Sequence, residues 1–317
     1  MKITLKNLIG TFAFALIVIM LLVGLSYLFM PKNNQLQFGM EDVAANGILG
    51  EKPNTIDVLV IGDSEAYSSI IPMQLWQDHG FTTYVCATSA QYLSYSQKML
   101  KQAFENQAPQ LVIMETNAIY RDMKFEKSII AQLEYYFSIF KYHDRWKSMS
   151  QNDFLGKVEY TWTDDLKGYF YNIYVKRANA SNHMKPSDEI QPINTLNKMY
   201  IESMADFCNQ NAATFLLVST PSTVNWNSKK HNGIQQLANE LGIEYIDLNI
   251  GETKVPINWE QDTRDAGDHL NHYGAVKTTT FLGEYLSHHY ELPDNRKNPD
   301  YVKWNESLAR YTEKIAG

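Results

Sequence analysis

A serine and a histidine that lie far apart in the chain both have neighbours suited to nucleophilic catalysis. Ser64 comes shortly after the apolar run 58–61, and His269 lies in a polar loop that also holds Asp265 and Asp268. A serine hydroxyl becomes a nucleophile when a base removes its proton, and the base needs an acid that fixes its tautomer and stabilises its charged form. The two stretches therefore contain a nucleophile, a base and an acid.

The same residues also have other uses. Asp63 and Ser64 are both favoured N-cap residues, so either one could do no more than begin the helix that follows. The loop adds a second histidine, and its possible zinc or manganese ligands are Asp265, Asp268, His269 and His272. A nucleophile, a helix cap and a metal site all stay open at this point.

The elements that must position these residues follow a regular pattern. Apolar runs alternate with helical patterns over residues 56–290, which is typical of an α/β domain with a mostly parallel sheet. The five strand candidates fit a flavodoxin-like three-layer sandwich, and one helix is predicted over 66–79. Ligands bind at the carboxyl ends of the strands in such sheets. We therefore expect Ser64 and the loop around His269 to meet at one edge of the sheet.

Residues 118–190 interrupt the alternation with a dense group of aromatic residues. We interpret this segment as an insertion that forms a cap beside the sheet, with most of its aromatic side chains in a small core of their own. Stacking on sugar rings and contact with a membrane are the alternatives. The polar cluster of His143, Arg145 and Trp146 is a candidate for substrate binding, and a surface ion pair is its simpler interpretation.

The N-terminal segment 1–30 is predicted to be a membrane anchor. Residues 8–30 contain no charge, and this run is long enough to span a bilayer. The run is longer than the apolar centre of a usual signal peptide, which favours an uncleaved anchor in the cell membrane. Lys2 and Lys6 precede the run and only Lys32 closely follows it, which favours a cytoplasmic N-terminus and an extracytoplasmic main domain.

Two further segments flank the α/β pattern. Residues 31–55 are polar and lack a strong periodicity, so we predict a juxtamembrane connector there. Residues 291–317 carry large apolar side chains at steps of three and four, which predicts an amphipathic helix that docks on the domain.

Composition narrows the possible partners. The net charge of −7 speaks against nucleic acid, because no basic face would remain to neutralise phosphates. Cys86 and Cys208 are too few to define a disulfide framework and are expected to be buried small hydrophobes, with a single bridge between them left open.

Two blocks of the sequence resemble the SGNH/GDSL hydrolase superfamily. The first is the strand that ends in Gly62-Asp63-Ser64, and the second is the block from His269-Leu270-Asn271 to Gly274-Ala275. The resemblance covers about residues 55–290, and the insertion is its least matched part. The anchor and the second block are similar to the cell-envelope branch of DltD-like and alginate-acetylation proteins. That branch acts on acyl groups of extracellular polymers, often beside a membrane-bound O-acyltransferase.

The resemblance implies a role for each catalytic residue. Ser64 matches the nucleophile and His269 matches the general base. The family places the acid three residues before the histidine, where this chain has Ala266, so we assign the acid to Asp265, which can return to the ring across one turn. Asp268 is the alternative acid and a candidate N-cap of the last helix.

The resemblance also implies three oxyanion donors. They are the backbone N–H groups of Ser64 and Ala87 and the side-chain amide of Asn117. Ala87 stands where the family commonly has glycine, an exchange that keeps the N–H but reduces the freedom of the turn. Asn117 also has the simpler interpretation of an asparagine that ends a strand in a turn.

The sequence therefore predicts a membrane-anchored, extracytoplasmic serine esterase or O-acyltransferase that acts on acyl groups of a cell-surface glycan or glycopolymer. A membrane-bound O-acyltransferase is a predicted partner, and no cofactor is predicted. One alternative is a non-catalytic scaffold of the same fold that binds an envelope polymer or an acyltransferase. The other is a metal-dependent hydrolase that uses the four loop ligands.

Overall fold

The computed structural model describes residues 5–316 and divides the chain into two compact units. The helical unit consists of Met1–Glu41 and Lys124–Thr161, and the α/β unit consists of Asp42–Met123 and Trp162–Gly317. Each unit therefore combines two separate stretches of the sequence.

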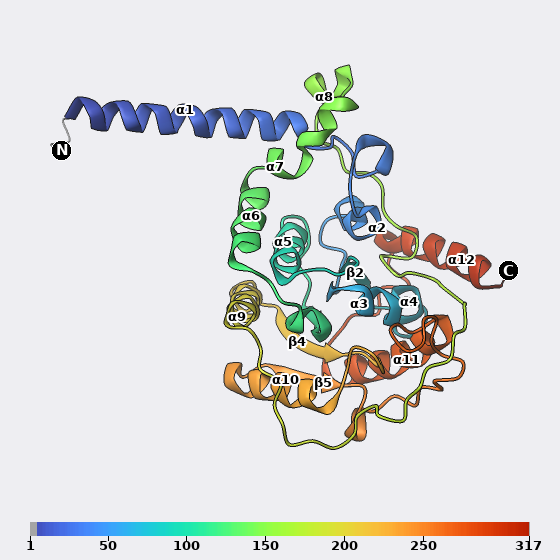
Figure 1. The fold of residues 1–317 in the computed structure, drawn as a ribbon. Helices are drawn as coiled ribbons and strands as arrows, with labels where there is room; N and C mark the ends of the chain where they lie inside the picture. The colour runs from blue at the N-terminus through green and yellow to red at the C-terminus, as the bar shows by residue number, and fades with distance from the viewer. Residues whose placement is uncertain (1–4, 317) are drawn as a thin grey trace. The chain divides into compact units, whose positions relative to one another are not determined.

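The α/β unit is built on a five-stranded sheet, of which β2, β4 and β5 are labelled in Figure 1. The strand order is β2-β1-β3-β4-β5. Every neighbouring pair of strands is parallel. This is the flavodoxin-like order, so the predicted fold class is confirmed. The strands are β1 (Val58–Gly62), β2 (Thr83–Ala87), β3 (Leu111–Glu115), β4 (Thr214–Ser219) and β5 (Glu244–Asp247).

Helices cover both faces of this sheet because both faces are apolar. Val58 and Val60 point to one face, where they pack in a cluster with Leu75 of α4 and Leu282 of α11. On that side α11 contacts both α3 and α4, whereas α5 and α9 contact each other and cover the opposite side. The helices are α3 (Ser64–Ser69), α4 (Pro72–His79), α5 (Leu93–Phe104), α9 (Thr195–Gln210), α10 (Ser228–Leu241) and α11 (His272–His289).

The helix predicted over 66–79 is in fact two helices. Residues 70 and 71 are extended, and α4 begins at Pro72, which is its first helical residue. Proline suits that position because its missing N–H has no acceptor there and its ring would disrupt a helix interior. The prediction of one continuous helix was therefore wrong, and the break keeps α3 short.

The segment predicted as a connector, 31–55, divides between the units. Residues 42–55 form α2 (Val43–Asn46) and the 3-10 helix η2 (Gly47–Gly50), in which Ala45 and Ile48 are buried. The Tyr84 hydroxyl of β2 donates to the Ala44 carbonyl at 2.8 Å. Apolar burial and this bond attach residues 42–55 to the sheet.

The C-terminal residues form α12 (Val302–Ala316), which packs against α4. Its Trp304 and Tyr311 are buried, and the Trp304 ring lies 5.6 Å from that of Trp76 in α4. Cys86 and Cys208 are free and buried, as expected for small hydrophobes. The remaining 3-10 helices of this unit are η3 (Thr116–Tyr120), η5 (Gly251–Thr253) and η6 (Pro299–Tyr301).

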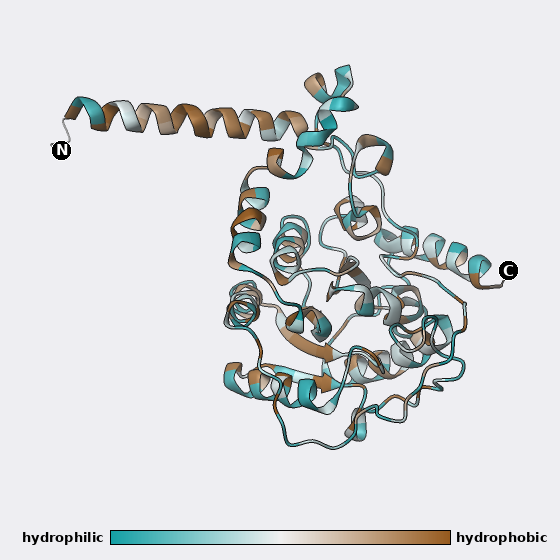
Figure 2. Cartoon of the chain, in the orientation of Figure 1, coloured by the Kyte–Doolittle hydropathy of each residue, from teal (hydrophilic) through white to brown (hydrophobic). Residues whose placement is uncertain are grey.

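The helical unit contains one helix, α1 (Leu5–Phe29), that is long and apolar enough to cross a membrane. Figure 2 shows apolar residues along most of its length. The predicted insertion 118–190 is divided, because residues 124–161 join α1 here and residues 162–190 belong to the α/β unit. The other helices of the helical unit are η1 (Leu36–Phe38), α6 (Phe125–Tyr136), α7 (Ile139–Tyr142), η4 (His143–Lys147) and α8 (Gln151–Leu155).

Candidate active site

Ser64 lies at the carboxyl end of β1, where it is the first residue of α3. The N-cap of that helix is Asp63, whose carboxylate accepts the Glu65 N–H at 3.1 Å, so the serine hydroxyl is not needed as a cap. The turn depends on Gly62, since a Cβ there would lie 2.8 Å from the Cβ of Glu115. Of the two residues that the sequence offered as a helix cap, Asp63 is the cap. The Ser64 hydroxyl is therefore available as a nucleophile.

The loop before α11 brings His269 to Ser64. A hydrogen bond of 2.8 Å joins His269 Nε2 and Ser64 Oγ, and a second of 2.6 Å joins His269 Nδ1 and Asp265 Oδ2. Because a carboxylate can only accept, Nδ1 carries the ring proton, and Nε2 accepts the serine O–H. The three side chains form one continuous hydrogen-bonded series from carboxylate to hydroxyl.

Asp268 lies beside this series and has another partner. Its Oδ2 is 3.7 Å from His269 Nδ1, and its Oδ1 accepts the side-chain amide of Asn225 at 2.5 Å. The prediction that Asp268 is the N-cap of the helix after this loop, α11, was wrong. That position belongs to Asn271, which accepts the N–H groups of Tyr273 and Gly274. The helix begins three residues later than a cap at Asp268 would require.

The three predicted oxyanion donors lie at the carboxyl ends of β1, β2 and β3. The Ser64 N–H is at the first position of α3 and so has no acceptor within the helix. The Val85 N–H donates to the Lys167 carbonyl on the outer side of β2, and Ala87, two residues on, directs its N–H to that same side and away from β1. Both backbone groups are therefore free of the pairing between β1 and β2.

Asn117 has a partner that sequence reasoning did not identify. Its side-chain amide donates to Asp63 Oδ2 at 3.0 Å, and Arg121 donates to the same oxygen at 2.7 Å. Asp63 therefore holds the amide beside the nucleophile, with one of its two N–H groups already used.

A cluster of buried acids lies under the nucleophile. Glu65 and Glu115 are each 1 % exposed, and burial raises the pKa of both carboxyl groups well above the ordinary value, with further contributions from neighbouring acids. Glu65 accepts the Asn225 amide at 2.6 Å through Oε1, while its Oε2 has no hydrogen-bond partner. No signal in the sequence indicates this cluster, because an acid next to a catalytic serine is as easily exposed as buried.

A cavity of about 280 Å³ lies beside Tyr67, which belongs to the same helix as Ser64. Tyr67 forms part of its wall, and its hydroxyl is near the side chains of Ser64 and Ser89. Arg264 donates to Ser68 at 2.8 Å and covers the ring of Phe170. The cavity is lined by Asp42, Val43, Ala44, Ala45, Tyr67, Ala87, Thr88, Ser89, Gly168, Tyr169 and Phe170.

Sequence reasoning did not select any of the cavity's aromatic residues. The one available signal was the position of Tyr67, which is three residues after Ser64 and therefore on the same face of the helix. Tyr169 and Phe170 lay inside the predicted insertion and were expected to belong to its own core.

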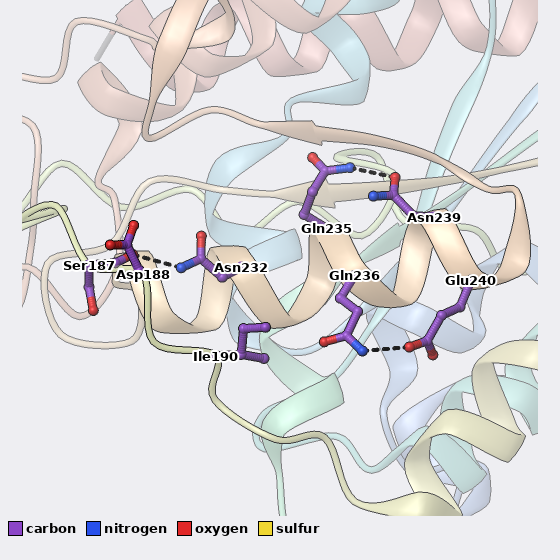
Figure 3. A pocket seen from close by; sticks show the side chains of 8 residues that line it. All are labelled: Ser187, Asp188, Ile190, Asn232, Gln235, Gln236, Asn239 and Glu240. Atoms are coloured by element: carbon purple, nitrogen blue, oxygen red, sulfur yellow. Dashed lines mark hydrogen bonds between the residues drawn. The ribbon is translucent and has the colours of Figure 1, made fainter.

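A larger hollow of about 640 Å³ lies elsewhere in the α/β unit, along α10 (Figure 3). Its amide and carboxyl side chains bond to one another, as in the 2.6 Å contact from Gln236 to Glu240. It holds no pairing of a nucleophile with a base among its lining residues, which are Ser187, Asp188, Ile190, Asn232, Gln235, Gln236, Asn239 and Glu240.

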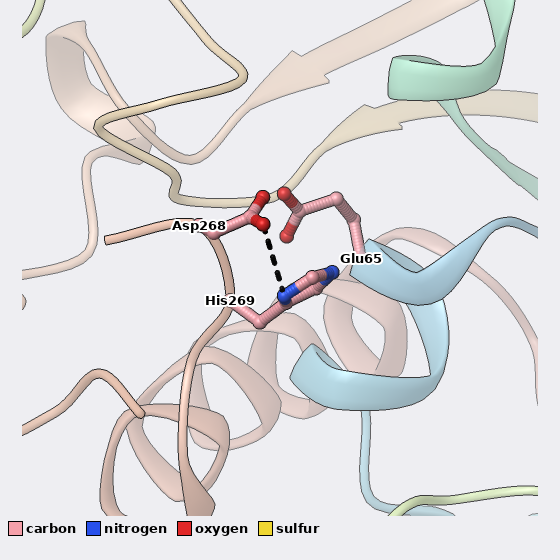
Figure 4. Close-up of side chains that lie close together, drawn as sticks. All are labelled: Glu65, Asp268 and His269. Carbon is pink, nitrogen blue, oxygen red and sulfur yellow. Dashed lines mark ion pairs between the residues drawn. The ribbon is translucent and has the colours of Figure 1, made fainter. Parts of the chain in front are cut away.

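The four loop residues predicted as metal ligands do not come together. The His272 ring lies among aromatic side chains, 3.2 Å from the Tyr169 hydroxyl and 5.0 Å from the ring centroid of Tyr171. Within the described part of the chain, the group with suitable spacing is Glu65, Asp268 and His269 (Figure 4). Both ring nitrogens of His269 are already bonded to Ser64 and Asp265. The geometry therefore favours a proton relay over the alternative of a metal site.

The residues predicted to bind substrate in the insertion belong to the helical unit. Arg145 forms a 2.5 Å ion pair with Asp153, and both side chains are largely buried. The His143 ring contacts the Phe140 carbonyl at 3.1 Å, and Trp146 is exposed. Arg145 thus has a structural partner, and a role for the three in substrate binding stays a prediction.

No family model and no curated protein matches the chain. Solved structures with a similar fold include a GDSL-like lipase from Bacteroides thetaiotaomicron, with 12% identity and a TM-score of 0.39 over 78% of this chain and 96% of that one. They also include a lipase/acylhydrolase from Enterococcus faecalis, with 8% identity and a TM-score of 0.39 over 75% and 99%. A psychrotrophic esterase from Pseudoalteromonas has 8% identity and a TM-score of 0.37 over 73% and 97%.

Proposed function

We propose that this protein is a serine esterase or O-acyltransferase of the SGNH/GDSL type, in which Ser64 is the nucleophile. The observation that carries the proposal is the unbroken series from Asp265 through His269 to Ser64, with contacts of 2.6 and 2.8 Å. A hydroxyl, a base and an orienting acid in this order are what acyl transfer through a covalent intermediate requires.

In the proposed reaction, Ser64 Oγ attacks the acyl carbonyl carbon while His269 Nε2 takes the hydroxyl proton. The carbonyl oxygen becomes an oxyanion, and the N–H groups of Ser64 and Ala87, with the Asn117 amide, stabilise its charge. The intermediate then expels the alcohol, to which His269 returns the proton. The acyl group remains on Ser64 as an ester until a second hydroxyl repeats the steps in reverse.

The second hydroxyl decides between the two activities. Water gives an esterase, and a sugar hydroxyl gives an O-acyltransferase. The cavity beside Tyr67 supports a substrate with both apolar and hydroxyl-bearing parts, because Tyr169 and Phe170 offer rings while Thr88 and Ser89 offer hydroxyls. We therefore propose acyl groups on a cell-surface glycan or glycopolymer as the substrate, with α1 as the anchor and a membrane-bound O-acyltransferase as a partner.

Labelling with a fluorophosphonate tests the nucleophile. The wild-type full chain should be labelled, and Ser64→Ala and His269→Ala should not be. Ser69→Ala is a matched control, since Ser69 is a buried serine of the same helix whose hydroxyl has no partner, and it should label like the wild type. Persistent labelling of Ser64→Ala, or no labelling of the wild type, would reject the proposal and favour a non-catalytic scaffold.

A further inference from the structure

One face of α6 in the helical unit is apolar and exposed. Phe125, Ile129, Leu133 and Tyr136 follow at steps of four, four and three, so they lie on one side of the helix. Their exposed fractions are 67%, 48%, 40% and 68%. Side chains of this size are normally covered by something when they are aligned on one face.

The same unit exposes further apolar side chains close to the membrane helix. Trp146 of η4 and the α8 residues Phe154 and Leu155 are 64%, 58% and 78% exposed. Helices α7 and α8 and the 3-10 helix η4 all contact α1, and α6 contacts α7. The elements that carry this exposed apolar surface are therefore linked by contacts to the helix that is suited to cross a membrane.

The contacts place these elements at the C-terminal end of α1. The Ile139 N–H of α7 donates to the Ser26 hydroxyl at 3.3 Å, and the Tyr27 hydroxyl donates to the Gly156 carbonyl at 3.4 Å. Arg145 donates to the Phe29 carbonyl, one of the last carbonyls of α1, which have no acceptor role within the helix. A side chain of η4 and a backbone N–H of α7 therefore bond to the end of α1.

The length of α1 puts this end in the interface of a bilayer. Its 25 residues extend about 37 Å, compared with a hydrocarbon thickness of about 30 Å. The last turn thus reaches the headgroup region, where tryptophan and tyrosine side chains are favoured. The elements bonded to that turn lie at the same depth.

We propose that α6, α7, η4 and α8 are interfacial helices that lie on the lipid surface, with the apolar face of α6 inserted among the lipids. Their contact with the lipids would add the buried area of α6, Trp146 and α8 to that of the single membrane helix. This proposal does not depend on the chemistry at Ser64, and it concerns a lipid bilayer as the occupant of the surface.

The test uses the full chain in phosphatidylcholine vesicles, with single cysteines labelled by an environment-sensitive fluorophore. Labels at Ile129→Cys and Leu133→Cys report on the apolar face, and Lys127→Cys reports on the opposite face of the same helix. The buried Cys86 and Cys208 should leave the unsubstituted chain unlabelled, which serves as the blank. Lipids with a nitroxide on the acyl chain then quench whichever labels reach them.

We expect labels at positions 129 and 133 to be quenched at least threefold more strongly than the label at 127, and to emit at shorter wavelength. Equal quenching at the three positions, with access to iodide in water, would overturn the proposal. Labels at 129 and 133 shielded from both lipid and iodide would also overturn it, because they would show that a second copy or another protein covers the face.

Discussion

Asp265 binds His269 through both of its carboxylate oxygens. Oδ2 accepts the ring Nδ1–H at 2.6 Å, and Oδ1 accepts the backbone N–H of the same residue, also at 2.6 Å. Two contacts to one residue fix the rotation of the ring as well as its tautomer. The carboxylate thereby keeps Nε2 directed at the Ser64 hydroxyl before any substrate arrives.

The two candidate acids should differ sharply on substitution. Asp265→Asn keeps an oxygen for the backbone N–H but can present an N–H to the ring, which stabilises the wrong tautomer, so we expect a loss of about 10⁴-fold in kcat. Asp268→Asn should change kcat only a few-fold, because the aspartate lies 3.7 Å from the ring nitrogen and its amide partner is retained. Hydrolysis of a p-nitrophenyl ester measures both.

Far-UV circular dichroism of the two variants is the control for folding. Equal losses in well-folded Asp265→Asn and Asp268→Asn would contradict the assignment of a single acid. A larger loss in Asp268→Asn would move the acid role to that residue.

The parts of this site that the sequence predicted are those that depend on local pattern. Ser64 follows an apolar run and His269 lies in a polar loop. A parallel sheet brings the turns at the carboxyl ends of its strands to one edge. Asp265 was assigned from chain geometry, since a neighbouring side chain such as Asp268 diverges from the ring. Pro72 carried a visible signal for the helix break that the prediction did not use.

The remaining features depend on contacts between distant parts of the chain. Asn225 joins Glu65 to Asp268 from a loop after β4, at a distance of about 160 residues in sequence from Glu65. The attachment of residues 42–55 to the sheet follows from a bond between Tyr84 and Ala44. The polar sequence of residues 42–55 indicates only a connector, because it does not show which of the apolar residues pack against the sheet.

The buried Glu65 should make the fold less stable as the pH rises. Burial raises its pKa above the ordinary 4.5, so the unfolded chain releases this proton at lower pH than the folded chain, and stability falls with pH between the two values. Glu65→Gln removes the penalty while its side-chain oxygen still accepts from Asn225. We expect the variant to gain about 1–3 kcal/mol over the wild type at pH 8 and little at pH 4.5.

Denaturant unfolding of the detergent-solubilised chain at the two pH values measures this difference. Glu202→Gln, at an exposed position of α9, is the matched control and should show the same small effect at both. A wild type that is relatively more stable at pH 8 than Glu65→Gln would show that the carboxylate is charged and paired in the fold.

The cavity beside Tyr67 should decide which esters are accepted. Ala44 lines it as an exposed residue, and its carbonyl rather than its side chain holds Tyr84, so Ala44→Phe fills space without breaking that bond. We expect kcat/KM for bulky esters to fall by at least about tenfold, equivalent to about 1.4 kcal/mol. Labelling by a small ethyl fluorophosphonate should be unchanged. Equal losses for both reagents would indicate damage to the site.

The ion pair between Lys167 and Glu51 should be important for the stability of the α/β unit. Its length is 2.7 Å, and the two side chains are 0% and 5% exposed. Lys167→Met leaves the Glu51 carboxylate buried without its partner, for which we expect a loss of about 3–5 kcal/mol in the free energy of unfolding. Lys167→Met combined with Glu51→Leu should recover most of that loss, because no uncompensated charge remains.

The ion pair between Lys52 and Asp300 provides the matched control. It has the same length of 2.7 Å, but its side chains are 54% and 63% exposed. Solvent screens such a pair, so Lys52→Met should cost no more than about 1 kcal/mol. Similar losses for Lys52→Met and Lys167→Met would show that burial does not determine the cost. A double variant no more stable than Lys167→Met would mean that the contact of the Lys167 ammonium with the Trp304 ring, 4.8 Å away, carries the effect instead.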